Sequence, residues 1–143
     1  MAKSIKNTKK IKHRIKELKI HSEERGWFIE MLRRNGLKDE IKQISVASIK
    51  PGCVRGNHYH LNKTEWFFII NGKANFYLEN PKTGERICLK LSSKNPKAIT
   101  VFPQIAHAIK NIDKKTIYFV EADSVIYNHK KPDSIPYLVC KQN

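Results

Sequence analysis

The stretch GCVRGNHYHLNKTEWFFIING, residues 52–72, combines two histidines, a glutamate and an apolar run that ends at an Asn-Gly pair. Successive side chains of an extended strand point to opposite faces, so His58 and His60 share one face. A four-residue loop, LNKT, separates them from Glu65, which opens the apolar run. The stretch therefore predicts two strands that bring His58, His60 and Glu65 beside one another.

The rest of the chain shows the same period-two alternation, interrupted by turn residues. The segments predicted as strands are 17–21, 27–32, 43–49, 65–70, 73–79, 86–91, 98–102, 107–112 and 116–122. Asn71-Gly72 is typical of a type I′ hairpin turn, and NPKTGE (80–85) predicts the next turn. One early helix is predicted in IKHRIKEL (11–18), where apolar residues recur at helical spacing. So many short strands indicate an all-β barrel or sandwich, and a barrel of this size holds one ligand in its mouth.

The composition is that of one folded domain. The chain has 143 residues, of which 40% are hydrophobic and 29% charged, which excludes a disordered protein. No apolar run reaches the roughly 18 residues of a membrane span, and the N-terminus lacks the apolar segment of a secretory signal. Cys53, Cys88 and Cys140 form no CxxC pair, which indicates a reducing compartment. We therefore expect a cytoplasmic protein with no membrane partner.

The formal net charge of +15 indicates either an anionic partner or a solvated basic surface. Eight of the first twenty residues are Lys or Arg, against the single acid Glu17. The remaining excess is spread along the chain without the aromatic residues that stack on bases, so nucleic acid is not the favoured partner. A small phosphorylated ligand would use the same positive field.

A third histidine strengthens the pattern of residues 52–72. FPQIAHAIKN (102–111) places His107 at the start of another predicted strand. The imidazoles of His58, His60 and His107 and the carboxylate of Glu65 form a ligand set suited to Zn, Fe, Mn or Ni, with coordination positions left for substrate or water. The alternative is that these histidines are core or surface residues. The spacing, together with the barrel pattern, favours the metal site.

These residues also resemble the two conserved motifs of the cupin superfamily. The first motif is matched at every defined position, by Gly52, His58, His60, Glu65 and Gly72. The second is matched by Pro103, His107 and Asn111, with Gln104 where glycine is usual. The resemblance implies a single-domain cupin, a double-stranded β-helix or jelly-roll barrel. We assign it to residues 20–143, preceded by a basic N-terminal extension over residues 1–19.

Two segments resemble the dTDP-4-dehydrorhamnose 3,5-epimerase family, a branch of the RmlC-like cupins. ERGWFIE (24–30) is similar to its RGxFxE segment, whose Arg, Phe and Glu contact the nucleotide of the substrate. The matching residues are Arg25, Phe28 and Glu30. RGNHYH (55–60) is similar to its RGLHYQ, which implies a diphosphate contact by Arg55 and a catalytic base at His58. His60 stands where that family has Gln, so this chain gains a ligand that those metal-independent epimerases lack.

The chain also resembles the C-terminal zinc cupin of bifunctional enzymes that make nucleotide-linked N-acetyl-L-fucosamine for capsular polysaccharide. Those enzymes carry RGNHYH, the following Glu, a distal His on zinc, and a late PDT that Pro132-Asp133-Ser134 matches. The resemblance runs from about residue 20 to residue 137. It implies a zinc ion and C3 epimerisation of a UDP-4-keto sugar. Related cupins exchange an N-terminal strand between subunits, which implies a homodimer.

The two resemblances give His58 different roles, because a histidine that binds a metal cannot also accept the proton. We favour metal binding, since four ligands are present together. A nearby side chain would then transfer the proton, and the candidates are Tyr59, Lys63, Glu121 and Tyr127. Glu121 is also expected to contact the substrate.

The sequence thus predicts a metal-dependent epimerase or isomerase acting on a nucleotide-diphosphate 4-keto-6-deoxy sugar, UDP- or dTDP-linked, in surface polysaccharide synthesis. Proton removal next to the ketone would be the chemical step. Two alternatives stay open: a cupin that binds a sugar nucleotide without catalysis, and an iron cupin oxygenase of a small organic acid.

Overall fold

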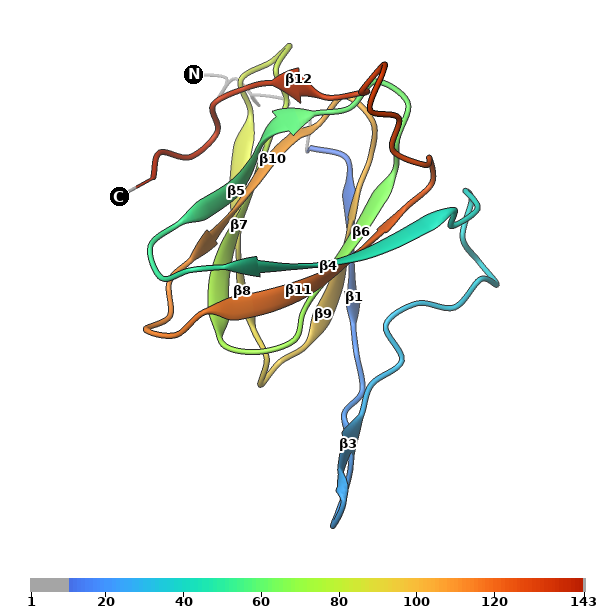
Figure 1. The fold of residues 1–143 in the computed structure, drawn as a ribbon, viewed down its shortest axis with the longest axis vertical. Coiled ribbons are helices and arrows are strands. Elements are labelled where there is room, and N and C mark those ends of the chain that lie inside the picture. Colours follow the sequence, from blue (N-terminus) through green and yellow to red (C-terminus); the bar gives the residue numbers. More distant parts are fainter. Residues whose placement is uncertain (1–10, 143) are drawn as a thin grey trace, which may run out of the picture.

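The computed structural model describes residues 11–142, and this range folds into twelve strands without a helix (Figure 1). The strands are β1 (His13–Glu17), β2 (His21–Glu23), β3 (Gly26–Phe28), β4 (Gln43–Ile49), β5 (Val54–Tyr59), β6 (Glu65–Ile69), β7 (Lys73–Glu79), β8 (Arg86–Ser92), β9 (Lys97–Val101), β10 (Ala106–Asn111), β11 (Ile117–Asp123) and β12 (Ile135–Pro136). No element of the described range has the length and apolar character of a membrane-crossing helix.

Ten of the strands form two five-stranded antiparallel sheets that face each other as a jelly-roll barrel. One sheet has the order β1-β9-β6-β11-β4 and the other the order β12-β5-β10-β7-β8. β2 and β3 form a separate two-stranded hairpin, which projects away from the barrel (Figure 1). The prediction of an all-β jelly roll is confirmed.

The apolar core lies between the two sheets and follows from the alternation along the strands. In β7, for example, Ala74, Phe76 and Leu78 point inward and are fully buried. The ring of Phe67 on β6 contacts those of Phe76 and Phe119, with centroids 5.2 and 6.0 Å apart. The core therefore joins the two sheets and gives the barrel a firm interior.

Asn71-Gly72 does not form the predicted hairpin turn. β6 and β7 lie in different sheets, so the turn carries the chain from one sheet to the other. Only Gly72 takes a positive φ, of 73°, whereas a type I′ turn needs it at both residues. The Asn71 side chain instead accepts a hydrogen bond from Tyr118 N on β11, at 2.8 Å. The turn predicted at residues 80–85 does connect the paired strands β7 and β8.

The predicted helix over residues 11–18 is wrong, because this segment contains β1. β1 pairs with β9 over its whole length, from His13 opposite Val101 to Glu17 opposite Lys97. Ile11 is 4% exposed and belongs to the core. The described part of the basic extension (1–19) thus joins the barrel sheet, and residues 1–10 lie outside the described residues.

The strand predicted over residues 17–21 is not formed, because residue 17 ends β1, residue 21 begins β2, and residues 18–20 connect them. Of the strand predicted over residues 27–32, only Trp27 and Phe28 belong to a strand, β3, which pairs with β2 as a hairpin. Trp27 and Phe28 on this hairpin are 57% and 67% exposed. A two-stranded hairpin alone is marginally stable in water. Among residues 11–142, its two aromatic side chains thus form an apolar surface that is left largely exposed.

Gly56 is the point where β5 approaches β10 most closely. Its φ is 102°, and a Cβ there would lie 2.7 Å from the main-chain oxygen of His107 and 3.1 Å from Ala108 Cα. The register between the two strands shifts at this position. Only glycine therefore allows β5 and β10 to pair beside His58 and His107.

We expect Gly56→Ala to lower the free energy of unfolding by about 2–3 kcal/mol, since it adds a main-chain clash to an unfavourable φ. Gly84→Ala is the matched control, because Gly84 also has a positive φ but faces open space. It should cost only about 1 kcal/mol. Urea unfolding measures both, and equal losses would contradict the close approach at Gly56.

Candidate metal centre

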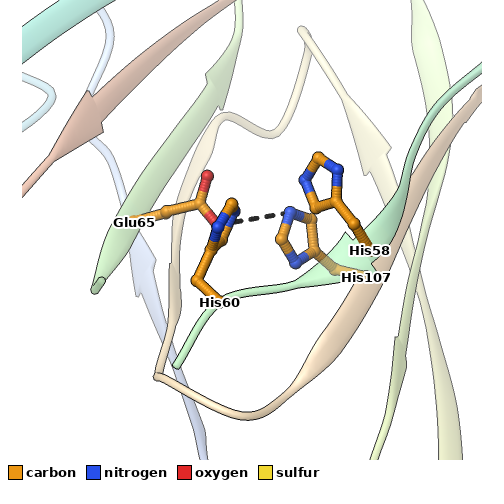
Figure 2. A group of neighbouring side chains, drawn as sticks. All are labelled: His58, His60, Glu65 and His107. Atoms are coloured by element: carbon orange, nitrogen blue, oxygen red, sulfur yellow. Dashed lines mark ion pairs between the residues drawn. The ribbon is translucent and has the colours of Figure 1, made fainter. Parts of the chain in front are cut away.

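The four predicted ligands converge inside the barrel (Figure 2). His58 on β5 lies opposite His107 on β10 in the strand pairing. His60 follows the end of β5, and Glu65 begins β6 in the facing sheet. One donor atom from each side chain lies within 4.8 Å of the others. Both sheets thus contribute to the group.

The group contains buried polar atoms without hydrogen-bond partners. Glu65 Oε1 lies 3.0 Å from His60 Nε2 and 3.3 Å from His107 Nε2. Neither Glu65 Oε1 nor His60 Nε2 makes a hydrogen bond, although Glu65 is 1% and His60 5% exposed. Buried polar atoms are normally satisfied, and a buried charge needs a counter-charge. These residues therefore fit a divalent cation, which would take up the free donor atoms.

Two of the three imidazoles have the protonation behaviour of metal ligands. Burial, reinforced by the neighbouring histidines, lowers the pKa of both His58 and His107 to about 3. Both rings are therefore neutral at physiological pH, as metal binding requires. Burial also lowers the pKa of His60, but the nearby Glu65 carboxylate outweighs it and the pKa is raised overall. His60 is thus the ring that Glu65 stabilises as a cation.

Two more carboxylates lie beside Glu65. Oxygen atoms of Glu65, Glu121 and Asp123 come within 4.8 Å of one another. Lys63 Nζ lies 4.0 Å from Glu65 Oε2 and 3.9 Å from Asp123 Oδ1. Burial and the mutual proximity of the carboxylates raise the pKa of Glu121 to about 8 and that of Asp123 to about 7. The site thus concentrates acidic groups around a single lysine.

A cavity of 540 Å³ opens above this group. Phe67 and Phe119 belong both to its wall and to the core, so the packed core forms its floor. Its cationic lining residues are Arg55, Lys63 and Lys131, and Arg55 Nε donates to Ser48 O at 2.7 Å. The volume suits a small organic ligand, and the cations suit an anionic one.

The turn before His107 keeps the conformation that glycine usually supplies. Gln104 has a φ of 68°, a left-handed conformation for a residue with a side chain. Its N–H donates to the main-chain oxygen of His60 at 2.6 Å. The turn is therefore formed although Gln104 stands where glycine is usual, and the hydrogen bond links the turn to His60, another of the predicted ligands.

The predicted substrate and proton-transfer residues divide into two groups. Those that line the cavity are Arg55, Lys63, Glu121 and Tyr127. Tyr59 instead packs against Tyr137 on the other side of β5, with ring centroids 6.2 Å apart. Arg25, Phe28 and Glu30 lie on or next to the projecting hairpin and do not line the cavity of their own chain. Arg25 is exposed and pairs with Glu23 at 2.6 Å.

The sequence predicts no role for two residues that line the site, Asp123 and Asp133, although Asp133 belongs to the PDT match. Asp123 follows from the alternation of β11, because Phe119, Glu121 and Asp123 all point inward. This pattern was available in the sequence. Asp133 lines the cavity from the segment between β11 and β12, where no periodicity predicts its position.

Comparison with protein families gives one match over most of the chain. Residues 21–135 match the family described as polysaccharide biosynthesis C-terminal domain. A reviewed relative, UDP-2-acetamido-2,6-beta-L-arabino-hexul-4-ose reductase of Pseudomonas aeruginosa, is 29% identical over 82% of this chain and 31% of its own length. Spore coat polysaccharide biosynthesis protein SpsL of Bacillus subtilis is 27% identical over 84% of this chain and 83% of its own length.

Solved structures share the fold. The capsular polysaccharide assembling protein CapF of Staphylococcus aureus superposes with a TM-score of 0.67 and 24% identity, over 85% of this chain and 34% of that one. The dTDP-6-deoxy-D-glucose-3,5-epimerase RmlC of Legionella pneumophila, bound to dTDP-4-keto-L-rhamnose, gives a TM-score of 0.76 and 22% identity, over 88% and 73%. The chain thus spans about a third of the reductase and of CapF. The resemblance to RmlC-like cupins and the cupin fold are confirmed.

We expect the protein to bind about one zinc ion per chain, and Glu65→Gln to weaken zinc binding at least about tenfold. The metal-free variant should be at least as stable as the wild type, because glutamine carries no buried charge. Zinc at about 100 times the wild-type Kd should stabilise the wild type by about 2.7 kcal/mol and Glu65→Gln by about 1.4 kcal/mol or less. Thermal unfolding with and without zinc tests both effects. His129→Ala, outside the group, should respond to zinc like the wild type, and equal stabilisation of Glu65→Gln would contradict the site.

Proposed function

Because the chain belongs to the polysaccharide biosynthesis C-terminal domain family, we propose that it is a metal-dependent epimerase or isomerase of a sugar nucleotide. The substrate is a 4-keto-6-deoxy sugar linked to UDP or dTDP, used in surface polysaccharide synthesis. The reductase relative is named for a UDP-linked 4-ulose, and the RmlC structure holds a dTDP-linked 4-keto sugar. These names support the substrate class.

The observation that carries the proposal is the position of three imidazoles and a carboxylate in a cavity whose wall also includes Arg55 and Lys131. Zinc is the favoured cation, because its common ligands are neutral imidazole and carboxylate, and Fe, Mn and Ni accept the same set. A divalent cation held by His58, His60, Glu65 and His107 supplies Lewis-acid polarisation of a carbonyl oxygen.

The side chains around the cavity suit a diphosphate. Arg55 lies on β5 and is held by its bond to Ser48 O, and a planar guanidinium contacts phosphate oxygens in two places. Lys131 approaches from the segment after β11. We assign the diphosphate to these two residues, which leaves the sugar between them and the ligand group.

Epimerisation next to a ketone requires that a proton leave carbon and return to it. Three of the side chains predicted to transfer the proton line the cavity: Lys63, Glu121 and Tyr127. Glu121 lies against Glu65, and burial raises its pKa to about 8, so this carboxyl both holds and releases a proton near neutral pH. Tyr127 lies on a more exposed part of the wall. We propose that proton transfer involves these residues rather than Tyr59.

A second copy of the chain would complete the site. Arg25, Phe28 and Glu30, which resemble nucleotide-contacting residues, lie away from the cavity of their own chain. The projecting hairpin exposes Trp27 and Phe28, an apolar surface suited to burial against another subunit (Figure 1). We propose a homodimer in which each hairpin contacts the nucleotide bound by its partner.

The proposal places the protein in the cytoplasm. Cys53, Cys88 and Cys140 are free in the structure, which fits a reducing compartment.

The zinc-loaded protein should exchange a carbon-bound proton of a UDP- or dTDP-4-keto-6-deoxy sugar with solvent deuterium, at C3 or C5. Proton NMR in D₂O follows the loss of the signal. Tyr127→Phe should slow the exchange about 100-fold, since it removes a proton-transfer group. Tyr59→Phe, the same change outside the cavity, should not. Binding without exchange would indicate the non-catalytic alternative, and oxygen consumption with bound iron the oxygenase.

If the site is shared between subunits, two variants that each bind UDP weakly should complement each other in a mixed dimer. Arg25→Ala and Arg55→Ala should each weaken UDP binding at least about tenfold, since each removes a charged contact to the ligand. Mixed dimers of the two variants would contain one site with both arginines intact. Titration of the mixture with UDP should therefore recover high-affinity binding at a fraction of the sites. No recovery after subunit exchange would contradict a site shared between subunits.

A further inference from the structure

Asp133 lies where the chain returns from β11 to β12, and it forms part of the cavity wall. β12 pairs with β5, and Pro136 lies opposite His58. The returning segment therefore runs against the strand that carries the histidines. In Figure 1 this segment, in red, crosses the end of the barrel beside β5.

The Asp133 carboxylate holds the loop that follows His60. Its Oδ1 accepts a hydrogen bond from Leu61 N at 2.8 Å, and its Oδ2 accepts one from Asn62 N at 2.9 Å. Both oxygens are thus used on consecutive main-chain N–H groups. Two charge-assisted bonds to adjacent amides fix the position and the direction of the loop.

The main-chain oxygen of the same residue contacts the His60 ring. It accepts a hydrogen bond from His60 Nδ1. Because a carbonyl oxygen can only accept, Nδ1 carries a proton, and Nε2 is the ring nitrogen that is left to bind a metal. This Nε2 atom is 3.0 Å from Glu65 Oε1. The contact therefore turns the metal-binding nitrogen toward the other ligands.

His107 Nδ1 makes the same kind of contact with Ile105 O, but at 3.5 Å, and Ile105 has no carboxylate of its own that could anchor the acceptor. The loop after His60 is also tied at its other end to the segment that carries Asp133. Ser124 N donates to Thr64 O at 3.0 Å, and Thr64 N donates to Ser124 Oγ at 2.9 Å. The four-residue loop between His60 and Glu65 is thus held at both ends by one segment.

We propose that Asp133 is a positioning residue for the cation site, which sets the orientation of His60 through its carboxylate and its main-chain oxygen together. The carboxylate fixes where the main-chain oxygen lies relative to the loop, and that oxygen fixes the ring. The inference rests on the cation site of the proposed function. It adds that the segment after β11 controls how tightly and in which geometry that site binds a metal.

Asp133→Asn tests the inference, because the amide nitrogen cannot accept the second main-chain bond. The measurements are zinc affinity by competition with a chelator and the visible absorption of the Co²⁺-loaded protein, which reports ligand geometry. We expect a loss of zinc affinity of about tenfold or more and a changed cobalt spectrum. Asp133→Ser, which keeps one oxygen acceptor, should change both readouts in the same direction.

Asp39→Asn is the matched control. Asp39 Oδ2 accepts a hydrogen bond from Thr64 Oγ1 at 2.7 Å, so this carboxylate contacts the same loop but not His60. The control should keep the zinc affinity and the cobalt spectrum of the wild type. If both Asp133 variants keep the zinc affinity and the cobalt spectrum of the wild type, or if Asp39→Asn loses as much zinc affinity as they do, the inference is overturned and the proposed function is not affected. A wild-type protein that binds neither metal would overturn the proposed function as well.

Discussion

The buried carboxylate of Glu65 is the constraint on which the rest of the site depends. It is 1% exposed, and it shares its surroundings with Glu121, Asp123 and a single lysine, Lys63. With all three carboxylates ionised and the histidines neutral, as metal binding requires, two negative charges remain without a counter-charge, and a divalent cation supplies two positive ones. Without the cation, protons on Glu121 and Asp123 neutralise part of this charge, since the pKa values of these carboxyls are raised to about 8 and about 7. The charge arrangement of the barrel interior thus favours a bound metal.

The jelly roll is what allows these charges to be buried together. Glu65 begins a strand of one sheet, whereas His58 and His107 lie opposite each other in the other sheet, so the ligands meet only when the sheets pack. The packed core beneath the cavity keeps the two sheets at a fixed distance from each other, and Gly56 lets β5 and β10 pair beside the ligands. The same strands that stabilise the fold therefore position the chemistry, while part of the cavity wall comes from the segment between β11 and β12, which has no regular structure.

The sequence predicted the parts that depend on local pattern. The alternation over residues 43–122 gave the barrel strands, and the spacing in residues 52–72 gave three of the four ligands that the structure brings together. The sequence-based predictions failed where contacts between distant parts of the chain determine the structure. β1 was predicted as a helix because its apolar spacing is ambiguous, and its partner β9 lies more than 80 residues later in the chain. Asp133 acts through bonds to a loop that is 71 residues or more away, which no short-range pattern shows.

X-ray absorption of the zinc-loaded protein tests the central claim most directly, because it reports the ligands of the metal itself. The account predicts a first shell of nitrogen and oxygen at about 2.0–2.2 Å. It also predicts outer-shell scattering from three imidazole rings. Sulfur at about 2.3 Å would place the metal on the cysteines instead. That result, or scattering from a single imidazole, would contradict a cation held by His58, His60, Glu65 and His107.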